Sequence, residues 1–120
     1  MVQSINTKVD LVVDATSFME LTAYGEIMVG DRGFEFYHAR DPRKHIQVPW
    51  EQLERVRATV FLKGRWIPRF TLETKSGMML IFASKKPKML LFLIGRQIGC
   101  DNIVHDIGML DVLSRLFVYS

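Results

Sequence analysis

The stretch Gly25-Glu-Ile-Met-Val-Gly-Asp-Arg-Gly-Phe-Glu-Phe-Tyr37 predicts a β-hairpin around which the rest of the chain is organised. Two runs of alternating apolar and polar residues flank Gly30-Asp-Arg-Gly33, and a period of two is typical of strands with one buried and one solvated face. In the second run Phe34 and Phe36 alternate with Glu35 and Tyr37, so the glutamate falls on the solvated face. The two glycines are expected to supply the positive φ angles of the turn.

Alternation and turn signals on both sides of this hairpin predict about seven short strands before residue 84. They are the two arms of the hairpin and residues 10–15, 46–50, 56–63, 66–73 and 78–83. Thr16 and Ser17 are expected to end the first of them. Pro49 has no N–H to donate, so its strand should lie at an edge of the sheet or end a ladder. On the strand that begins at Trp66, the period of two places Trp66 on the buried face together with Phe70 and Leu72.

After residue 84 the pattern becomes helical. Ser84-Lys-Lys-Pro-Lys88 is a typical helix start, and the helix over residues 88–98 is apolar without a gap from Met89 to Ile94. Because a helix that is apolar all round needs cover on more than one side, we expect one side to close the sheet and a C-terminal helix to cover the other. That second helix is predicted from the helical spacing of Ile107, Leu110, Leu113, Leu116 and Phe117, and the break before it from Gly95, Gly99, Asp101 and Asn102.

Length and composition indicate one globular domain over residues 1–120. The single cysteine, Cys100, excludes an internal disulfide and fits a reducing compartment. Residues 1–8 lack the basic start and apolar core of a signal peptide, and no apolar stretch approaches the roughly 18 residues that span a bilayer. We therefore expect a cytoplasmic protein.

The net charge of +3 is unevenly distributed along the chain. Residues 1–36 carry two basic and six acidic side chains, whereas residues 37–88 carry twelve basic and four acidic ones. Such a field favours an anionic partner for one face, which can be nucleic acid, a lipid headgroup surface or an acidic protein. The alternative is that the strands place lysine and arginine on their solvated sides and nothing more.

No pattern in the sequence indicates catalysis. The histidines at 38, 45 and 105 lack the spacing of a zinc site, and there is no phosphate-binding loop, dinucleotide fingerprint or nucleophile elbow. We therefore expect a protein that is not an enzyme and that has no catalytic residues, metal or cofactor.

A recognition surface is the remaining candidate, because basic residues cluster in the predicted loops and strand ends. Arginine together with tryptophan is typical of binding hot spots, and also of the core and rim of a sheet. Trp66 is expected in the core, whereas Trp50 can belong to either. The candidate surface comprises Arg40, Arg43, Lys44, Trp50, Lys63, Arg65, Arg69, Lys85, Lys86 and Lys88.

The predicted order of short strands followed by a helix resembles a pleckstrin-homology-like barrel of the GRAM type, in which the helix plugs one end. The chain is also similar to a small family from Gram-positive bacteria, the regulators of the mannose operon. The segments that carry this resemblance are Met1-Val-Gln-Ser-Ile-Asn-Thr-Lys-Val-Asp-Leu11, Gly30-Asp-Arg-Gly-Phe-Glu-Phe-Tyr37, Ile46-Gln-Val-Pro-Trp-Glu51, Lys63-Gly-Arg-Trp-Ile-Pro-Arg-Phe70 and Phe82-Ala-Ser-Lys-Lys-Pro-Lys88.

Members of that family are encoded beside mannose-class phosphotransferase permeases, so the resemblance implies a role tied to sugar uptake. It points first to a regulatory or accessory module that binds the permease or its cytoplasmic phosphocarrier components. The alternative is a transcriptional regulator that binds the DNA of the mannose operon. Nucleic acid is not the expected partner, because the sequence has no helix-turn-helix and its basic residues fall on sheet loops. Peripheral contact with the inner face of the membrane and self-association stay open.

Overall fold

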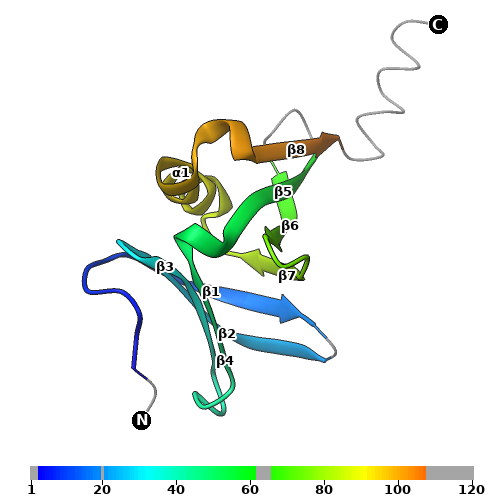
Figure 1. Cartoon of the computed structure of the whole chain (residues 1–120). Helices are drawn as coiled ribbons and strands as arrows, with labels where there is room; N and C mark the ends of the chain where they lie inside the picture. The colour runs from blue at the N-terminus through cyan, green and yellow to red at the C-terminus, as the bar shows by residue number, and fades with distance from the viewer. Residues whose placement is uncertain (1–2, 20, 62–65, 108–120) are drawn as a thin grey trace, which may run out of the picture.

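The computed structural model describes residues 3–19, 21–61 and 66–107. These residues form an open, mixed sheet of eight strands, with one α-helix packed against one of its faces (Figure 1). The elements are β1 (Val9–Phe18), β2 (Thr22–Gly30), β3 (Gly33–His38), β4 (His45–Pro49), η1 (Trp50–Gln52), β5 (Leu53–Phe61), β6 (Trp66–Thr74), β7 (Met79–Ser84), α1 (Pro87–Ile98), η3 (Cys100–Asn102) and β8 (Ile103–Ile107).

The strands follow the order β4-β3-β2-β1-β7-β6-β5-β8, and all neighbours are antiparallel except β5 and β8. The edge position predicted for the strand that contains Pro49 is therefore confirmed. The barrel implied by the resemblance is wrong, because the sheet is open and its end strands β4 and β8 do not pair within the described part of the chain. To close a seven-stranded barrel, β5 would have to pair with β4. Here β5 pairs with the parallel strand β8 instead.

The central hairpin has the predicted arms, but its glycines serve another purpose. Ile27 lies opposite Phe36, and Val29 lies opposite Phe34. Among the described glycines, only Gly77 and Gly99 have positive φ. A Cβ atom on Gly30 would lie 2.3 Å from the Lys8 carbonyl oxygen, and one on Gly33 would lie 2.5 Å from that of Val48. These glycines are therefore required by the close approach of neighbouring backbone, and not by the dihedral angles of the turn.

The core lies between the inner face of the sheet and α1. Phe82 lies at its centre. The centroid of the Phe82 ring is 5.1 Å from that of Phe34 and 6.0 Å from that of Phe70. From α1, Leu90, Leu91 and Ile94 are buried on this face, as expected for the side of the helix that closes the sheet. Met89 and Phe92 point the other way and are exposed. The C-terminal helix that was expected to cover them falls on residues 108–120, which lie outside the described residues.

Several boundaries differ from the sequence predictions. β1 continues through Thr16 and Ser17 to Phe18, because both residues pair with β2 and with β7. α1 begins at Pro87 and ends before Gly99, which has a φ of +99°, so this break is confirmed. The segment after it forms β8 up to Ile107, so the prediction that Ile107 belongs to a helix is wrong. Of the helices in the described residues, none is long and apolar enough to cross a membrane.

Of the two tryptophans, Trp66 was expected in the core and is exposed, whereas Trp50, whose place the sequence left open, is buried. Trp66 is 52% exposed and rests against Phe61, with ring centroids 5.2 Å apart. The register of β5 and β6 shifts between Thr59 and Phe61, so alternation counted from Phe70 fails at Trp66, and Ile67 is buried instead. Trp50 is buried and its Nε1–H donates to the Gly30 carbonyl at 3.0 Å. Trp50 therefore belongs to the core, and Trp66 is exposed.

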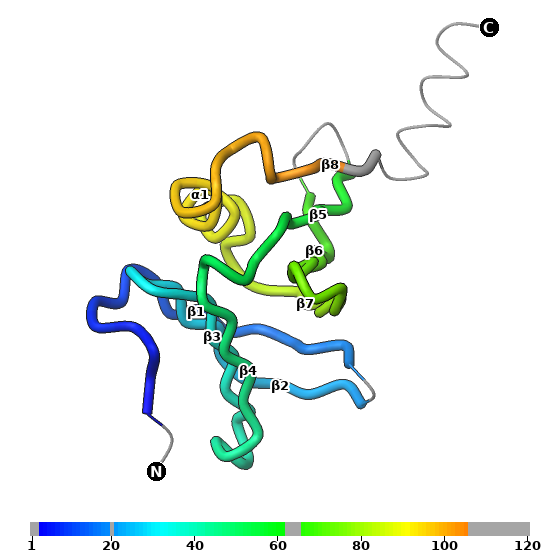
Figure 2. Tube along the Cα trace, in the orientation of Figure 1, coloured from blue at the N-terminus to red at the C-terminus, as the bar shows by residue number. Residues whose placement is uncertain are grey.

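The N-terminal segment, residues 3–8, lies beside the β3 end of the sheet (Figure 2). It bonds to Glu35 on the outer face and buries this glutamate, which was expected to be solvated. Ser4 Oγ, Asn6 Nδ2 and the Tyr37 hydroxyl donate to the carboxylate at 2.6, 2.8 and 2.5 Å. The Ile5 N–H and Gln47 Nε2 donate at 3.1 and 3.0 Å. A period of two identifies the face of a residue in the sheet but cannot show that another segment covers that face.

Candidate functional site

The candidate site lies where two hairpins diverge from the common sheet. β2 and β3 are paired only from Gly25 and His38 onward, and beyond that point the β1–β2 hairpin and the β3–β4 hairpin run in different directions (Figure 1). A Cβ atom on Gly25 would lie 2.0 Å from the Tyr37 carbonyl oxygen. The glycine therefore permits the close crossing of β3 over β2 from which the two hairpins separate.

The wedge between these hairpins is a groove of about 530 Å³, mostly apolar in its lining. It opens on the inner face of the sheet, beyond the part that α1 covers, and no residue of α1 lines it. Leu21 on its rim is 82% exposed, and Met19 beside it is also exposed. The lining residues, which we call the hairpin groove, are Ser17, Met19, Leu21, Thr22, Ala23, Phe36, His38, Lys44, His45 and Ile46.

The loop between β3 and β4 adds positive charge beside the hairpin groove, with Arg40, Arg43 and Lys44 against a single acid, Asp41. Arg43 Nε lies 3.1 Å from the Asp41 carboxylate. Hydrogen bonds from the side chain and the backbone N–H of Arg43 lower the pKa of Asp41 from its usual 3.8. Arg40 and Lys44 form no ion pair with any residue that the structure describes. The loop thus offers two cations that form no ion pair with a described residue.

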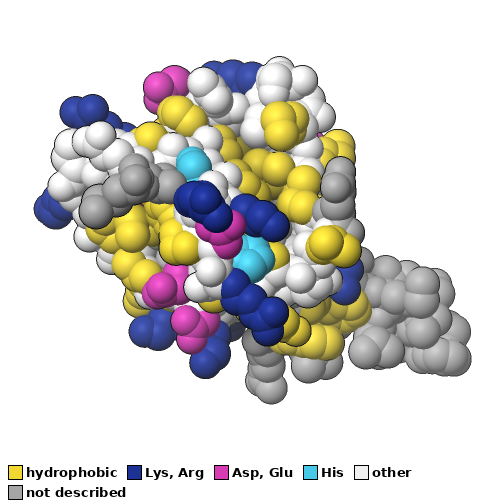
Figure 3. Space-filling view, turned by 90° about the horizontal axis from the view of Figure 1, so that it is seen from below, with side chains coloured by type: hydrophobic (Ala, Val, Ile, Leu, Met, Phe, Trp, Pro, Cys, Tyr) yellow, Lys and Arg dark blue, Asp and Glu magenta, His cyan; other side chains and the backbone are white. Residues whose placement is uncertain are grey.

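Backbone bonds hold this loop in a defined shape. The His38 N–H donates to the Lys44 carbonyl at 3.1 Å, and the Lys44 N–H donates to that of Asp41 at 2.9 Å. His38 Nδ1 accepts the N–H groups of Arg40 and Asp41 at 3.1 and 3.2 Å, which leaves its Nε2 as the donor of the neutral ring. Figure 3 shows lysine, arginine and histidine side chains gathered beside hydrophobic ones on the face seen from below. A cationic and an apolar surface are therefore contiguous here.

The structure separates the predicted surface residues into several groups. Arg40, Arg43 and Lys44 come together on the β3–β4 loop, and Lys85, Lys86 and Lys88 lie at the start of α1. Arg69 lies on β6 with its guanidinium 4.6 Å from the centre of the Phe18 ring. Trp50 is buried in the core, with 8% of its surface exposed. Lys63 and Arg65 lie outside the described residues, so their convergence with the loop stays a prediction.

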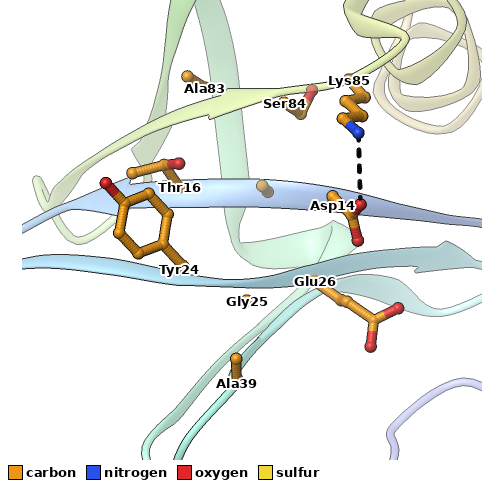
Figure 4. A pocket seen from close by; sticks show the side chains of 10 residues that line it. Asp14, Thr16, Tyr24, Gly25, Glu26, Ala39, Ala83, Ser84 and Lys85 are labelled. Atoms are coloured by element: carbon orange, nitrogen blue, oxygen red, sulfur yellow. Dashed lines mark ion pairs between the residues drawn. The ribbon is translucent and has the colours of Figure 1, made fainter.

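A second hollow, of about 540 Å³, lies on the outer face between β1, β2 and β7. In Figure 4 Asp14 and Lys85 point toward one another, and their charged atoms are 3.7 Å apart, while Glu26 points away from both. The side chains of this ion pair are largely exposed. Within the part of the chain that the structure describes, no three His, Cys, Asp or Glu side chains group as metal ligands. We therefore take the hairpin groove and the β3–β4 loop as the candidate site.

The sequence predicted the cationic loop but not the groove. The available signal was the run Phe18-Met-Glu-Leu21, which is apolar where a hairpin turn is ordinarily polar. The prediction that Thr16 and Ser17 end the first strand hid this signal, because the strand in fact continues to Phe18 and Met19 and Leu21 lie at the tip of the β1–β2 hairpin.

The fold has a counterpart among solved structures. It is similar to the crystal structure of the C-terminal domain of an unknown protein from Leishmania infantum, with a TM-score of 0.66 over 76% of this chain and 84% of that chain. The two sequences are 6% identical, so the likeness concerns the fold alone. Comparison with curated proteins gives no match to this chain.

At the level of sequence, residues 1–117 match the family described as "Domain of unknown function (DUF956)". The match covers nearly all of the chain, including every strand of the sheet and α1. The chain therefore belongs to the DUF956 family.

Proposed function

We propose that this protein is a non-enzymatic regulatory or accessory module of the mannose-class sugar phosphotransferase system, and that it acts by binding a permease or phosphocarrier component. The observation that carries the binding role is the exposed apolar hairpin groove next to the cationic β3–β4 loop. The link to sugar uptake comes from the resemblance of the sequence to regulators of the mannose operon.

The energetics of the groove favour a protein partner. Leu21 is almost fully exposed, and burying a side chain of this size contributes roughly 1.5–3 kcal/mol. An exposed leucine in a groove that Lys44 also lines fits an apolar interface centre with a polar rim. The cations at the rim would steer an acidic partner and select its orientation more than they would add affinity.

The test is binding between the purified full chain and each purified component of a mannose-class system, namely the permease in detergent and its cytoplasmic phosphocarrier domains. The Leu21→Ser variant should weaken binding, because it removes the exposed apolar side chain of the groove. Met79→Ser is the matched control, since Met79 is comparably exposed but lies on β7 and does not line the groove.

Failure of every component to bind would overturn the proposal. A specific footprint on the promoter of the neighbouring transport operon, at near-physiological salt, would favour the DNA-binding alternative, because non-specific phosphate contacts weaken steeply with salt.

A further inference from the structure

We propose that the hairpin groove binds an extended protein segment in which an apolar side chain is flanked by carboxylates. This inference rests on the proposed function, since it names the chemistry of the partner at that site. Three features of the groove, its lining, its unpaired backbone and its charge, each specify one property of the segment.

The lining specifies an apolar side chain. Phe36, Ala23 and Ile46 belong to neighbouring strands and line the groove, with Met19 and Leu21 at its rim. Elsewhere the inner face of the sheet is covered by α1 through Leu90, Leu91 and Ile94. At the groove no described residue provides such cover. An apolar side chain inserted there would bury this remaining part of the inner face.

The backbone specifies an extended conformation. The Tyr24 carbonyl accepts the Ala39 N–H at 2.9 Å, so the polar groups of Tyr24 face the β3 side of β2. In an antiparallel ladder the direction of these groups alternates, so those of Thr22 also face that side and those of Ala23 face β1. β3 has diverged by this point, and among the described residues Thr22 has no pairing partner on the β3 side. A strand laid in the groove can pair with its N–H and its C=O.

The charge specifies carboxylates next to the apolar side chain. Lys44 lines the groove, Arg40 lies in the same loop, and neither forms an ion pair with a described residue. Arg43 is held by Asp41 at 3.1 Å and is less available. A segment with acidic residues beside its apolar anchor would complement these two cations, whereas a basic segment would be repelled.

The shape favours a chain segment over a membrane surface. The hydrophobic residues line a concavity between two hairpins that point in different directions (Figure 1). A flat bilayer that touched both hairpin tips would leave the lining between them uncontacted. A single extended segment is narrow enough to enter it.

The test is a titration of the ¹⁵N-labelled full chain with a short synthetic peptide that has a central leucine flanked on both sides by glutamates, followed by amide resonances. We expect shifts confined to residues 17–23 and 36–46. Hydrogen exchange of the Thr22 amide should slow on binding, while that of Ala23, already bonded toward β1, should not change. Lys44→Glu and Leu21→Ser should each weaken binding by roughly fivefold or more, and Met79→Ser should leave it unchanged.

Two control peptides and one lipid surface give the results that would overturn the inference. Equal binding of a peptide with lysine in place of glutamate, or with serine in place of leucine, would overturn it. Stronger groove shifts with vesicles of phosphatidylcholine and phosphatidylglycerol would overturn it in favour of a lipid surface. If a transport component binds with no loss in Leu21→Ser and the peptide does not bind, this inference fails and the proposed function stands. If the peptide binds and no component does, the proposed function fails.

Discussion

The Ser4 hydroxyl lies 2.6 Å from the carboxylate of Glu35, so the N-terminal segment closes over a charged group in the third strand of the sheet. Asn6 reinforces the contact, since its Oδ1 accepts the Arg32 and Gly33 N–H groups at 2.8 and 2.9 Å while its Nδ2 donates to Glu35. One segment therefore buries the acid and fixes the turn of the central hairpin. The arrangement makes Glu35 a structural carboxylate.

Replacement of this carboxylate should destabilise the fold. Glu35→Gln places an amide against donors from Ser4 and Asn6, and we expect a loss of about 1–3 kcal/mol in the free energy of unfolding. Urea unfolding followed by circular dichroism measures it. Glu54→Gln, at a largely exposed surface position, is the control and should change the value by less than about 0.5 kcal/mol. Equal effects of the two substitutions would show that the Glu35 contacts contribute no more than a surface ion pair.

Acid should destabilise the folded protein over a defined range of pH. Burial raises the pKa of Glu35, but the hydrogen bonds from Ser4, Tyr37, Ile5 and Asn6 outweigh it and hold this pKa below its usual 4.5. The Thr7 hydroxyl and the Lys8 N–H lower the pKa of Asp31 from 3.8 to about 2. A carboxyl with a depressed pKa in the folded state stabilises it above the unfolded pKa, and this contribution is lost as the pH falls through the folded pKa.

We therefore expect the free energy of unfolding to fall as the pH decreases from about 4.5 toward 2, with a smaller fall in Glu35→Gln. Urea titrations at several pH values measure this dependence. An identical pH dependence in the variant would contradict the role assigned to Glu35.

The two tryptophans should be distinguishable by fluorescence. In Trp50→Phe the remaining Trp66 should be readily quenched by acrylamide, whereas in Trp66→Phe the remaining Trp50 should be protected, because Trp50 is 8% exposed. Trp50→Phe also removes the hydrogen bond to Gly30 and should destabilise the fold by about 1–3 kcal/mol, because it leaves a buried acceptor without its partner. Similar quenching in both variants would contradict the environments described above.

The helix should be sensitive on one side only. Leu90 is fully buried, so Leu90→Ala is expected to cost about 2–5 kcal/mol. Phe92 is 65% exposed, and Phe92→Ala should cost less than about 1 kcal/mol. Thermal unfolding of the two variants compares them directly. A large loss in Phe92→Ala would mean that this side of α1 is covered in solution, as the sequence predicted.

The hairpin arms, the edge strand and the helix start depend on local chemistry, and the sequence predicted them for that reason. Alternation places Ile27, Val29, Phe34 and Phe36 on one face whatever lies above it. Pro49 confines its strand to an edge because it lacks an N–H, and Pro87 suits the first turn of a helix for the same reason.

The candidate site was predicted only in part. The charges of Arg40, Arg43 and Lys44 are adjacent in sequence and were identified together. Their position beside Leu21 and Ile46 was not, because it depends on where β2 and β3 separate. That point is set by the close approach of Tyr37 to Gly25, a contact between residues of different strands.

By itself, then, the sequence determined where most of the strands and α1 lie and which side of most strands is apolar. Only the tertiary structure decided what covers each side: the N-terminal segment buries Glu35, a register shift exposes Trp66, and β8 occupies the edge that would have closed a barrel. The physical reason is that periodicity arises from contacts between residues a few positions apart. Burial arises from contacts between segments far apart in sequence, whose mutual placement no local pattern specifies.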